Sequence, residues 1–208
     1  ALGQYNLGEL YAYGKGVPRN YKEAMKWYRL AAEQGDTKSQ SILGEMYDFG
    51  RGVKQDYKKA IEWYLLALEQ NDPSAQSSLG LMYQYGHGVI QNYDEALRLF
   101  YLSAVQKDSY AQSNLGYMYS KGIGVEQDYK EAIKWYRLSA EQKNSTGQYN
   151  LGKMYAEGKG VGKDYQEAIK LYTFAAEQRN SEAQKALGDL YFSGEGVPED
   201  HLLARMWY

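Results

Sequence analysis

The feature that most constrains this chain is an unbroken repeat of 36 residues. The pair Leu-Gly recurs six times in one register, without insertion or deletion, and a tyrosine stands three residues after every glycine. The pairs begin at Leu7, Leu43, Leu79, Leu115, Leu151 and Leu187. Six copies in one register are not a chance arrangement, and each copy is expected to be one supersecondary unit. Such a unit cannot bury its apolar surface alone, so neighbouring copies must stack.

Each copy has the pattern of two helices. In the second copy, apolar and small residues at helical spacing predict a first helix over about 37–49. A second helix follows, with a broad apolar face. The residues that carry these two stripes are Gln40, Leu43, Gly44, Met46 and Tyr47 in the first helix and Tyr57, Ala60, Ile61, Trp63, Tyr64 and Ala67 in the second. The prediction is an all-α solenoid of helix-turn-helix repeats.

Capping residues mark the ends of these helices. Aspartate or asparagine stands where the N-cap of the first helix belongs, and Pro73 follows one of them at the first helical position. The first helix is expected to end at the first glycine of the recurring Gly-x-Gly-Val, in a left-handed conformation. Four second helices show the spacing of a capping box, a cap residue followed by Glu three places on. The first-helix caps are Asp36, Asp72, Asp108 and Asn144, and the boxes are Asn20/Glu23, Asn92/Glu95, Asp128/Glu131 and Asp164/Glu167.

A glycine in the middle of the first helix recurs in all six copies, beginning at Gly8. Glycine there costs about 1 kcal/mol relative to alanine, so its recurrence indicates a steric need. We expect close approach of the paired helix at its column of alanines, which begins at Ala24.

Composition argues against several functions. Lys and Arg total 24 against 26 Asp and Glu, which leaves no basic excess for nucleic acid. There is no cysteine, and the two histidines, His87 and His201, have no partner with which to share a metal. The Gly-x-Gly loops lack the strand and third glycine of a phosphate-binding loop, and the chain has no Ser-x-x-Lys. No apolar run is long enough for a transmembrane helix. We therefore expect no catalytic residues, no cofactor, no metal, no nucleic acid and no direct membrane insertion.

Columns that vary between copies are free to serve a partner. In the first helix they form one face, which begins at Leu2, Tyr5, Asn6, Glu9, Ala12 and Tyr13. Of 23 tyrosines, 16 occupy recurrent columns and are interpreted as core, while six of the other seven lie on this variable face. Exposed aromatic residues are enriched at binding hot spots. The alternative is that some of them, especially Tyr110 and Tyr149, pack against a neighbouring helix. The candidate partner-binding residues are Tyr5, Glu9, Tyr13, Glu45, Asp48, Phe49, Leu81, Tyr85, Tyr110, Tyr117, Tyr149 and Lys153.

The chain resembles the Sel-1-like repeat family, relatives of the tetratricopeptide repeats. The resemblance covers all six copies and rests on Leu-Gly-x-x-Tyr, Gly-x-Gly-Val-x-x-Asp-Tyr and Ala-x-x-Trp-Tyr, best seen between Ala111 and Tyr136. It implies a right-handed α-α superhelix whose first helices line a concave face, and a role in assembling other proteins, commonly in bacteria. The family is common in bacterial envelope, secreted or signalling settings and in the quality-control machinery of the eukaryotic secretory pathway; in an exported, periplasmic or secreted setting the targeting segment would lie outside this piece, and the sequence itself does not decide the compartment. Some members carry a disulfide in each repeat, and this chain departs from them.

The predicted organisation is a single solenoid over residues 1–208, with five full repeats and a truncated sixth, as a piece of a longer chain. The predicted function is a scaffold that binds a partner protein or peptide on the concave face. A patch across repeats three to five, Leu81, Tyr85, Tyr110, Tyr117, Tyr149 and Lys153, is the expected centre of binding. Two alternatives stay open. One is a structural spacer in a larger array, and the other is a carbohydrate or cell-wall binder or hydrolase.

Overall fold

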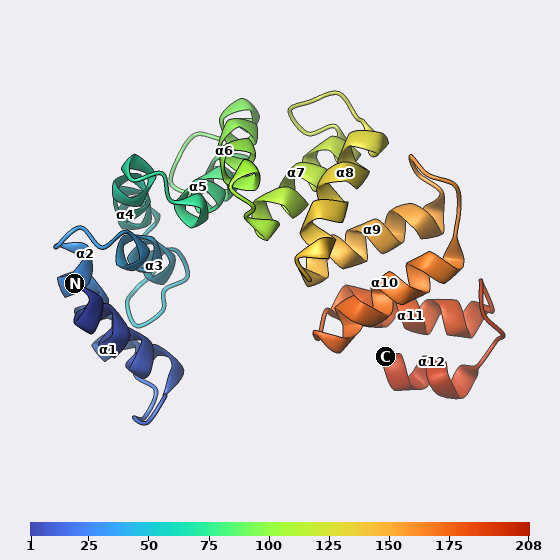
Figure 1. The fold of residues 1–208 in the computed structure, drawn as a ribbon, viewed down its shortest axis with the longest axis horizontal. Helices are drawn as coiled ribbons and strands as arrows, with labels where there is room; N and C mark the ends of the chain where they lie inside the picture. Colours follow the sequence, from blue (N-terminus) through green and yellow to red (C-terminus); the bar gives the residue numbers. More distant parts are fainter. The chain divides into compact units, whose positions relative to one another are not determined.

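A computed structural model describes all 208 residues and contains twelve α-helices and no strand (Figure 1). This confirms the all-α helical repeat solenoid. The chain divides into two compact units, Ala1–Ser103 and Ala104–Tyr208, and the division falls inside α6. The single solenoid over residues 1–208 stays a prediction. The helices are α1 (Leu2–Tyr13), α2 (Tyr21–Ala32), α3 (Thr37–Asp48), α4 (Tyr57–Glu69), α5 (Pro73–Tyr85), α6 (Tyr93–Val105), α7 (Ser109–Lys121), α8 (Tyr129–Glu141), α9 (Ser145–Glu157), α10 (Tyr165–Glu177), α11 (Ser181–Ser193) and α12 (His201–Trp207).

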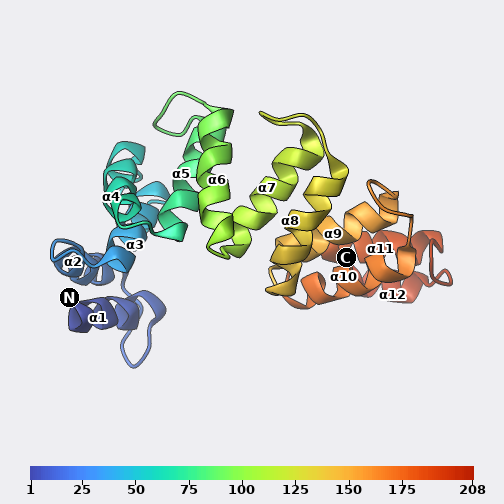
Figure 2. The ribbon, with the colours of Figure 1, turned by 45° about the horizontal axis from the view of Figure 1, so that its top comes forward.

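The predicted ends of the first helices are confirmed. The carboxylate of Asp72 accepts a hydrogen bond from the N–H of Ala75, and Pro73 occupies the first turn of α5. Asp36, Asp108 and Asn144 cap their helices in the same way. Gly86, which ends α5, has a φ of 71°, a left-handed conformation that favours glycine. The Gly-x-Gly-Val loops that follow project beyond the helix ends in both views (Figures 1 and 2).

The predicted capping boxes are wrong in their second half. Asp164 accepts from the N–H groups of Gln166 and Glu167, as expected of a cap. Its own N–H, however, donates to the carbonyl of Tyr155 at the end of the preceding helix. Because this donor is already satisfied, Glu167 turns outward and forms an ion pair with Lys170. The same pair of contacts recurs at the other three predicted boxes, with the ion pairs Glu23–Lys26, Glu95–Arg98 and Glu131–Lys134.

The mid-helix glycine does mark a close approach, but the neighbour is not the alanine column. A Cβ atom on Gly8 would lie 2.6 Å from Cε1 of Tyr28, which is closer than real Cβ contacts allow. The ring in this column fills the space in every repeat, as Tyr64, Phe100, Tyr136, Tyr172 and Tyr208. The alanines are fully buried, and Gly152 also comes near the carbonyl of Ala168. An aromatic ring packed directly against the first helix therefore explains the recurring glycine.

A glutamine column ties successive repeats together. The side-chain amide of Gln112 donates to the carbonyl of Ala104 in the preceding second helix, at 3.1 Å. Its oxygen accepts from Gln142 of its own repeat, at 2.7 Å. Gln40 makes the equivalent two contacts, with Ala32 and Gln70. The NH₂ group and the oxygen of this buried side-chain amide are both hydrogen-bonded, as buried polar groups usually are. These two bonds hold the neighbouring helices at a defined distance.

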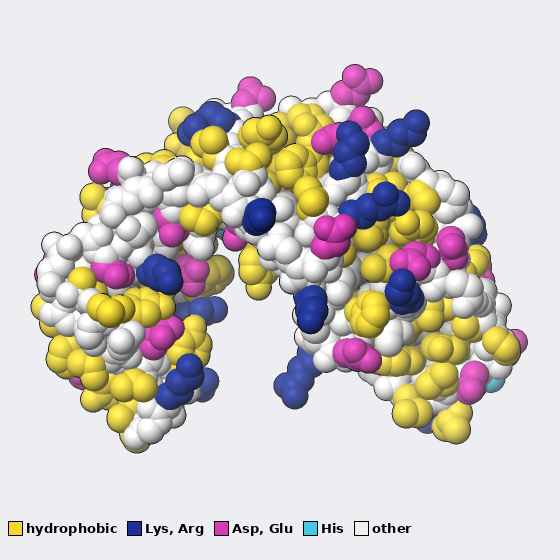
Figure 3. Space-filling view, viewed as in Figure 1, with side chains coloured by type: hydrophobic (Ala, Val, Ile, Leu, Met, Phe, Trp, Pro, Cys, Tyr) yellow, Lys and Arg dark blue, Asp and Glu magenta, His cyan; other side chains and the backbone are white.

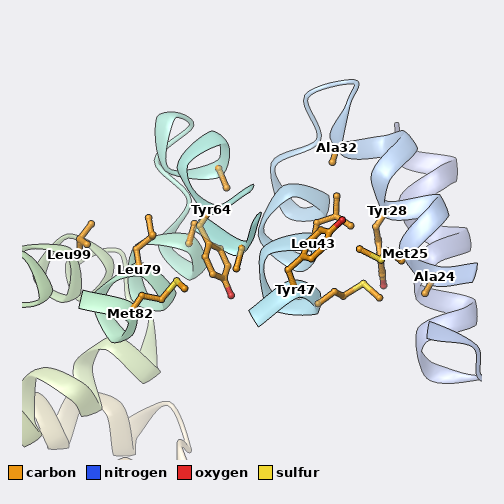
Figure 4. Close-up of a cluster of buried hydrophobic side chains, with 14 residues drawn as sticks. Ala24, Met25, Tyr28, Ala32, Leu43, Tyr47, Tyr64, Leu79, Met82 and Leu99 are labelled. Atoms are coloured by element: carbon orange, nitrogen blue, oxygen red, sulfur yellow. The ribbon is translucent and has the colours of Figure 1, made fainter. Parts of the chain in front are cut away.

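The core of the first unit is continuous across its repeats (Figure 4). Tyr28 and Met25 from α2 pack with Leu43 and Tyr47 of α3, and Tyr64 of α4 packs with Leu79 and Met82 of α5. Within each unit, a second helix thus contacts the first helix of the next repeat, as α2 contacts α3 and α8 contacts α9. The candidate surface lies on the part of the first helices that this stacking leaves open.

Candidate partner-binding surface

Three predicted residues form an exposed aromatic row in the first unit. Tyr13, Phe49 and Tyr85 stand at the same register position, where α1, α3 and α5 end. They are 66%, 61% and 56% exposed. In the second unit the same position holds Lys121, Glu157 and Ser193, so the row is aromatic in one unit and polar in the other.

Each ring of the aromatic row carries a basic side chain from its own loop. Lys15 Nζ lies 5.2 Å from the centroid of the Tyr13 ring, and Arg51 Cζ lies 5.1 Å from that of Phe49. The ring of His87 stacks between Tyr85 and Tyr57, with centroids 5.7 and 4.9 Å away. Cation–π contacts such as those of Lys15 and Arg51 are worth about 0.5–1 kcal/mol at exposed sites. The middle residue of Gly-x-Gly is exposed, as its sequence position indicates, but it folds back onto the helix end. Sequence reasoning missed this contact, although the basic residue two places after each aromatic residue could have signalled it.

Two predicted tyrosines are partly packed. The ring of Tyr5 lies 6.0 Å from that of Tyr28, and the ring of Tyr149 lies 5.7 Å from that of Tyr172. Tyr5 donates a hydrogen bond to the carboxylate of Glu9, and burial together with this bond raises the pKa of Tyr5 to about 12. Tyr149 therefore packs against a neighbouring helix, which was the alternative to a binding role. Tyr110 does not fit that alternative as well, because it is 67% exposed.

The variable face is not open along its whole width. The column that begins at Tyr5 contains Ser41, Ser77 and Ser113 in the next three repeats, and these serines are buried. Ser41 donates to the carboxylate of the cap Asp72. A small residue is needed there because the first helices of successive repeats contact each other, as α3 and α5 do. The exposed part of the face is therefore narrower than the variation between copies suggests.

A crevice opens between repeats one and two, with a volume of about 90 Å³. We call it the 1/2 crevice. The ring of Tyr28 lies in its lining, together with Tyr13, Tyr21, Glu45 and Arg51. Burial raises the pKa of Glu45, although the charge of Arg51 acts in the opposite direction. Burial also raises the pKa of Asp48, near the end of the same helix, although His87 acts in the opposite direction.

An equivalent crevice opens between repeats four and five, and its volume is about 350 Å³. We call it the 4/5 crevice. Its lining includes three predicted residues, Tyr117, Tyr149 and Lys153. Ser120 replaces Ala12 of the 1/2 crevice and Asn150 replaces Ile42, so this crevice is the more polar of the two. The lining also includes Lys121, Tyr129, Tyr136, Glu157 and Lys159.

The predicted patch across repeats three to five is divided between the two units. Leu81, which is partly buried, and Tyr85 belong to α5 in the first unit, and the other four residues belong to α7 and α9 in the second. In the second unit the structure brings Tyr117, Tyr149 and Lys153 to one crevice, whereas Tyr110 lies outside its lining. The patch as one surface stays a prediction.

No group of three or more His, Cys, Asp or Glu side chains is placed to hold a metal ion. His201 forms a contact with Glu199 at 2.8 Å and lies against the ring of Phe192, at the surface. Lys and Arg are interspersed with Asp and Glu over the face seen in Figure 3. None of the helices has the length and apolar character needed to cross a membrane. These observations leave the crevices and the aromatic row as the candidate surface.

Stacked helix hairpins held by a recurring glycine, aromatic ring and glutamine define a helical-repeat protein. The Sel1 repeat model matches residues 1–36, 37–72, 73–108, 109–144, 145–180 and 181–208. The chain belongs to the Sel1 repeat family, which confirms the resemblance noted from its motifs. Proteins of this family generally mediate protein–protein interaction and are typically not enzymes.

Solved structures agree with this assignment. A Sel1 repeat protein from Oxalobacter formigenes is 34% identical, with a TM-score of 0.89 over 99% of this chain and 82% of that one. A protective antigen with an SLR fold from uropathogenic Escherichia coli is 40% identical, with a TM-score of 0.77. It is matched over 100% of this chain, which spans 44% of that protein. An immunity protein from Pseudomonas aeruginosa, 20% identical, shares the fold with a TM-score of 0.70 over 99% of this chain and 78% of that one. No curated protein sequence matches the chain.

Proposed function

We propose that this chain is a scaffold that holds a partner protein or peptide on the exposed part of its first helices. The observation that carries the proposal is the aromatic row of Tyr13, Phe49 and Tyr85. Three large rings exposed at one register position are not needed for stacking, since the second unit has Lys121, Glu157 and Ser193 there. Aromatic anchors of this kind supply most of the binding energy at protein interfaces.

The crevices support the same proposal. Each opens beside the end of a first helix and is bordered by tyrosine rings with a few charged groups. Sites that bind side chains or small ligands are concave and combine aromatic walls with polar groups that fix the orientation of the ligand. A segment lying across the first helices of either unit would place a side chain in the crevice of that unit.

A carbohydrate-binding function is favoured less by the geometry. Sugars stack on the open faces of aromatic rings, and here one face of Tyr13, Phe49 and Tyr85 is occupied by Lys15, Arg51 and His87. A purely structural spacer would have no use for an exposed aromatic row. Both alternatives are outcomes of the experiment that follows.

The test is selection of ligands from a displayed random-peptide library and a glycan array on the purified chain. Selected peptides are then measured against the double variant Tyr85→Ala with Tyr117→Ala. Truncation of a hot spot typically costs about 2 kcal/mol or more of binding energy, so we expect at least a tenfold rise in Kd with unchanged helicity. The matched control is Phe174→Ala, an exposed aromatic residue of the second helix α10.

Three outcomes would contradict the proposal. Loss of binding in Phe174→Ala but not in the double variant would move the site to the second helices. Selection of glycans alone would establish carbohydrate binding. No ligand of either class would support the spacer.

A further inference from the structure

The 4/5 crevice holds an excess of positive charge. Lys121, Lys153 and Lys159 line it, against the single carboxylate of Glu157. Lys159 Nζ lies 2.7 Å from Oε2 of Glu157, and Lys153 Nζ lies 3.8 Å from Oε1. The hydrogen bond to Glu157 raises the pKa of Lys159. Lys121 has no carboxylate within ion-pair distance. One carboxylate therefore serves two ammonium groups, and a third ammonium group is unpaired.

Stacking of the repeats does not require the charges of Lys121 and Lys153. In the 1/2 crevice, the position of Lys153 is held by Glu45 and that of Lys121 by Tyr13. The helices around both crevices have the same lengths within one residue and the same glycine-to-tyrosine contact, Gly8 with Tyr28 and Gly116 with Tyr136. The fold accepts an acidic or a basic residue at this place, so the lysines are available for a ligand.

The lining around the lysines is aromatic and able to form hydrogen bonds. Tyr117 is 37% exposed, and the ring of Tyr149 is held in place against Tyr172. Lys159 lies over the ring of Tyr129, 5.8 Å from its centroid. A volume of about 350 Å³ admits one or two side chains of a docked segment. Carboxylate groups would pair with the lysines, and an apolar side chain beside them would lie on the tyrosine rings.

We propose that the 4/5 crevice binds an acidic peptide segment of the partner, with Asp or Glu side chains at Lys121 and Lys153 and an aromatic or aliphatic side chain against Tyr117 and Tyr149. This rests on the proposed function and names the chemistry of the partner. Charge complementarity selects the occupant, because a basic segment would meet three ammonium groups. The 1/2 crevice, with Glu45 in place of Lys153, does not share this preference.

The experiment measures binding of three fluorescein-labelled synthetic peptides by fluorescence anisotropy. The first peptide alternates Glu with Phe, the second alternates Lys with Phe, and the third alternates Gln with Phe. We expect the Glu peptide to bind at least tenfold more tightly than the other two at low salt. Its affinity should fall as the salt concentration rises, because exposed charges are screened over about 8 Å at physiological ionic strength.

The double variant Lys121→Gln with Lys153→Gln should lower the affinity for the Glu peptide by about tenfold or more. Each substitution removes a hydrogen bond between a lysine and a carboxylate of the peptide. Lys130→Gln with Lys134→Gln removes the same charge from the outer helix α8, outside the crevice, and should change Kd less than twofold. Thermal unfolding of both variants checks that the fold is retained.

In a separate competition experiment, inorganic phosphate is added to the complex of the chain with the Glu peptide. Displacement of the peptide by phosphate only at millimolar concentrations is expected for a site that also uses the tyrosine rings.

Equal binding of the Glu and Lys peptides, or an equal loss in the two double variants, would overturn the acidic-segment proposal. So would full displacement by micromolar phosphate, which would indicate an anion site without a peptide component. These failures differ from failure of the proposed function. If library peptides without acidic residues bind and lose affinity in Tyr85→Ala with Tyr117→Ala, the scaffold function stands and only the charge preference is wrong.

Discussion

A Cβ atom placed on Gly116 would lie 2.5 Å from Cδ1 of the Tyr136 ring. The ring belongs to the paired helix α8 and is 1% exposed, so an added Cβ atom would have to displace a buried ring. The same contact joins a glycine and an aromatic ring in all six repeats. It explains why a residue that weakens helices recurs in the middle of each first helix.

Gly116→Ala should therefore destabilise the protein, although alanine is the better helix former by about 1 kcal/mol. Overpacking typically costs about 1–3 kcal/mol, and Gly116→Leu should cost more than Gly116→Ala. Gly3 of α1 is the matched control, because a Cβ atom there meets nothing within 4 Å and Gly3→Ala should be neutral or stabilising. Thermal unfolding measures both. An unchanged midpoint for Gly116→Leu would show that the contact does not restrict this position.

Glu45 is expected to make stability depend on pH. Burial raises its pKa, so the folded state favours the protonated carboxyl group more than the unfolded state does. The resulting penalty is absent below the ordinary glutamate pKa of about 4.3 and grows as pH rises through the pKa of the folded state. Glu45→Gln should raise the thermal midpoint at pH 7, and this gain should vanish near pH 4. Glu141→Gln, at an exposed position of α8, is the control and should show no such gain. A gain that is the same at both pH values would contradict the assignment to burial.

In each half-formed capping box, the contribution of the cap residue to stability can be compared with that of the glutamate three places on. Asp164 accepts two backbone N–H groups of α10, whereas Glu167 makes only an exposed ion pair with Lys170. Asp164→Ala should cost about 1 kcal/mol of stability, as loss of a cap does. Glu167→Gln should cost less than about 0.5 kcal/mol, as expected for an exposed pair within one helix. Denaturant unfolding measures the loss of stability in both variants. Equal losses would indicate that Glu167 contributes to the cap as much as Asp164 does.

The tyrosines should separate into two classes when they are truncated. Tyr136→Ala empties a fully buried site and should cost about 3–5 kcal/mol, the typical loss for a large aromatic residue in a core. Tyr85→Ala removes a ring that is 56% exposed and should cost less than about 1 kcal/mol. Circular dichroism during thermal unfolding measures both changes. If Tyr85→Ala were as destabilising as Tyr136→Ala, the aromatic row would be part of the core.

The repeat, the helices and most of their caps were predictable from the sequence because they depend on local patterns. Asp72 and Pro73 mark the start of α5, and Gly86 marks its end, within a few residues of the pattern itself. The candidate surface was predictable only in part. The exposure of Tyr13, Phe49 and Tyr85 agrees with the prediction, but the packing of Tyr149 on Tyr172 depends on a helix of the same repeat that lies 23 residues further along the chain.

Helix periodicity acts over a few residues, and the 36-residue register with its recurring motifs indicates the kind of fold and the family of this chain. The packing of helices against each other decides what the register cannot. It places the ring of Tyr28, rather than the small Ala24, against Gly8, and it directs the N–H of Asp164 to Tyr155 instead of Glu167. It also brings Lys121 and Lys153, from two different repeats, to one crevice. Contacts between helices, within a repeat or between repeats, depend on side-chain volume and on the satisfaction of buried hydrogen-bonding groups, which only the packed structure determines.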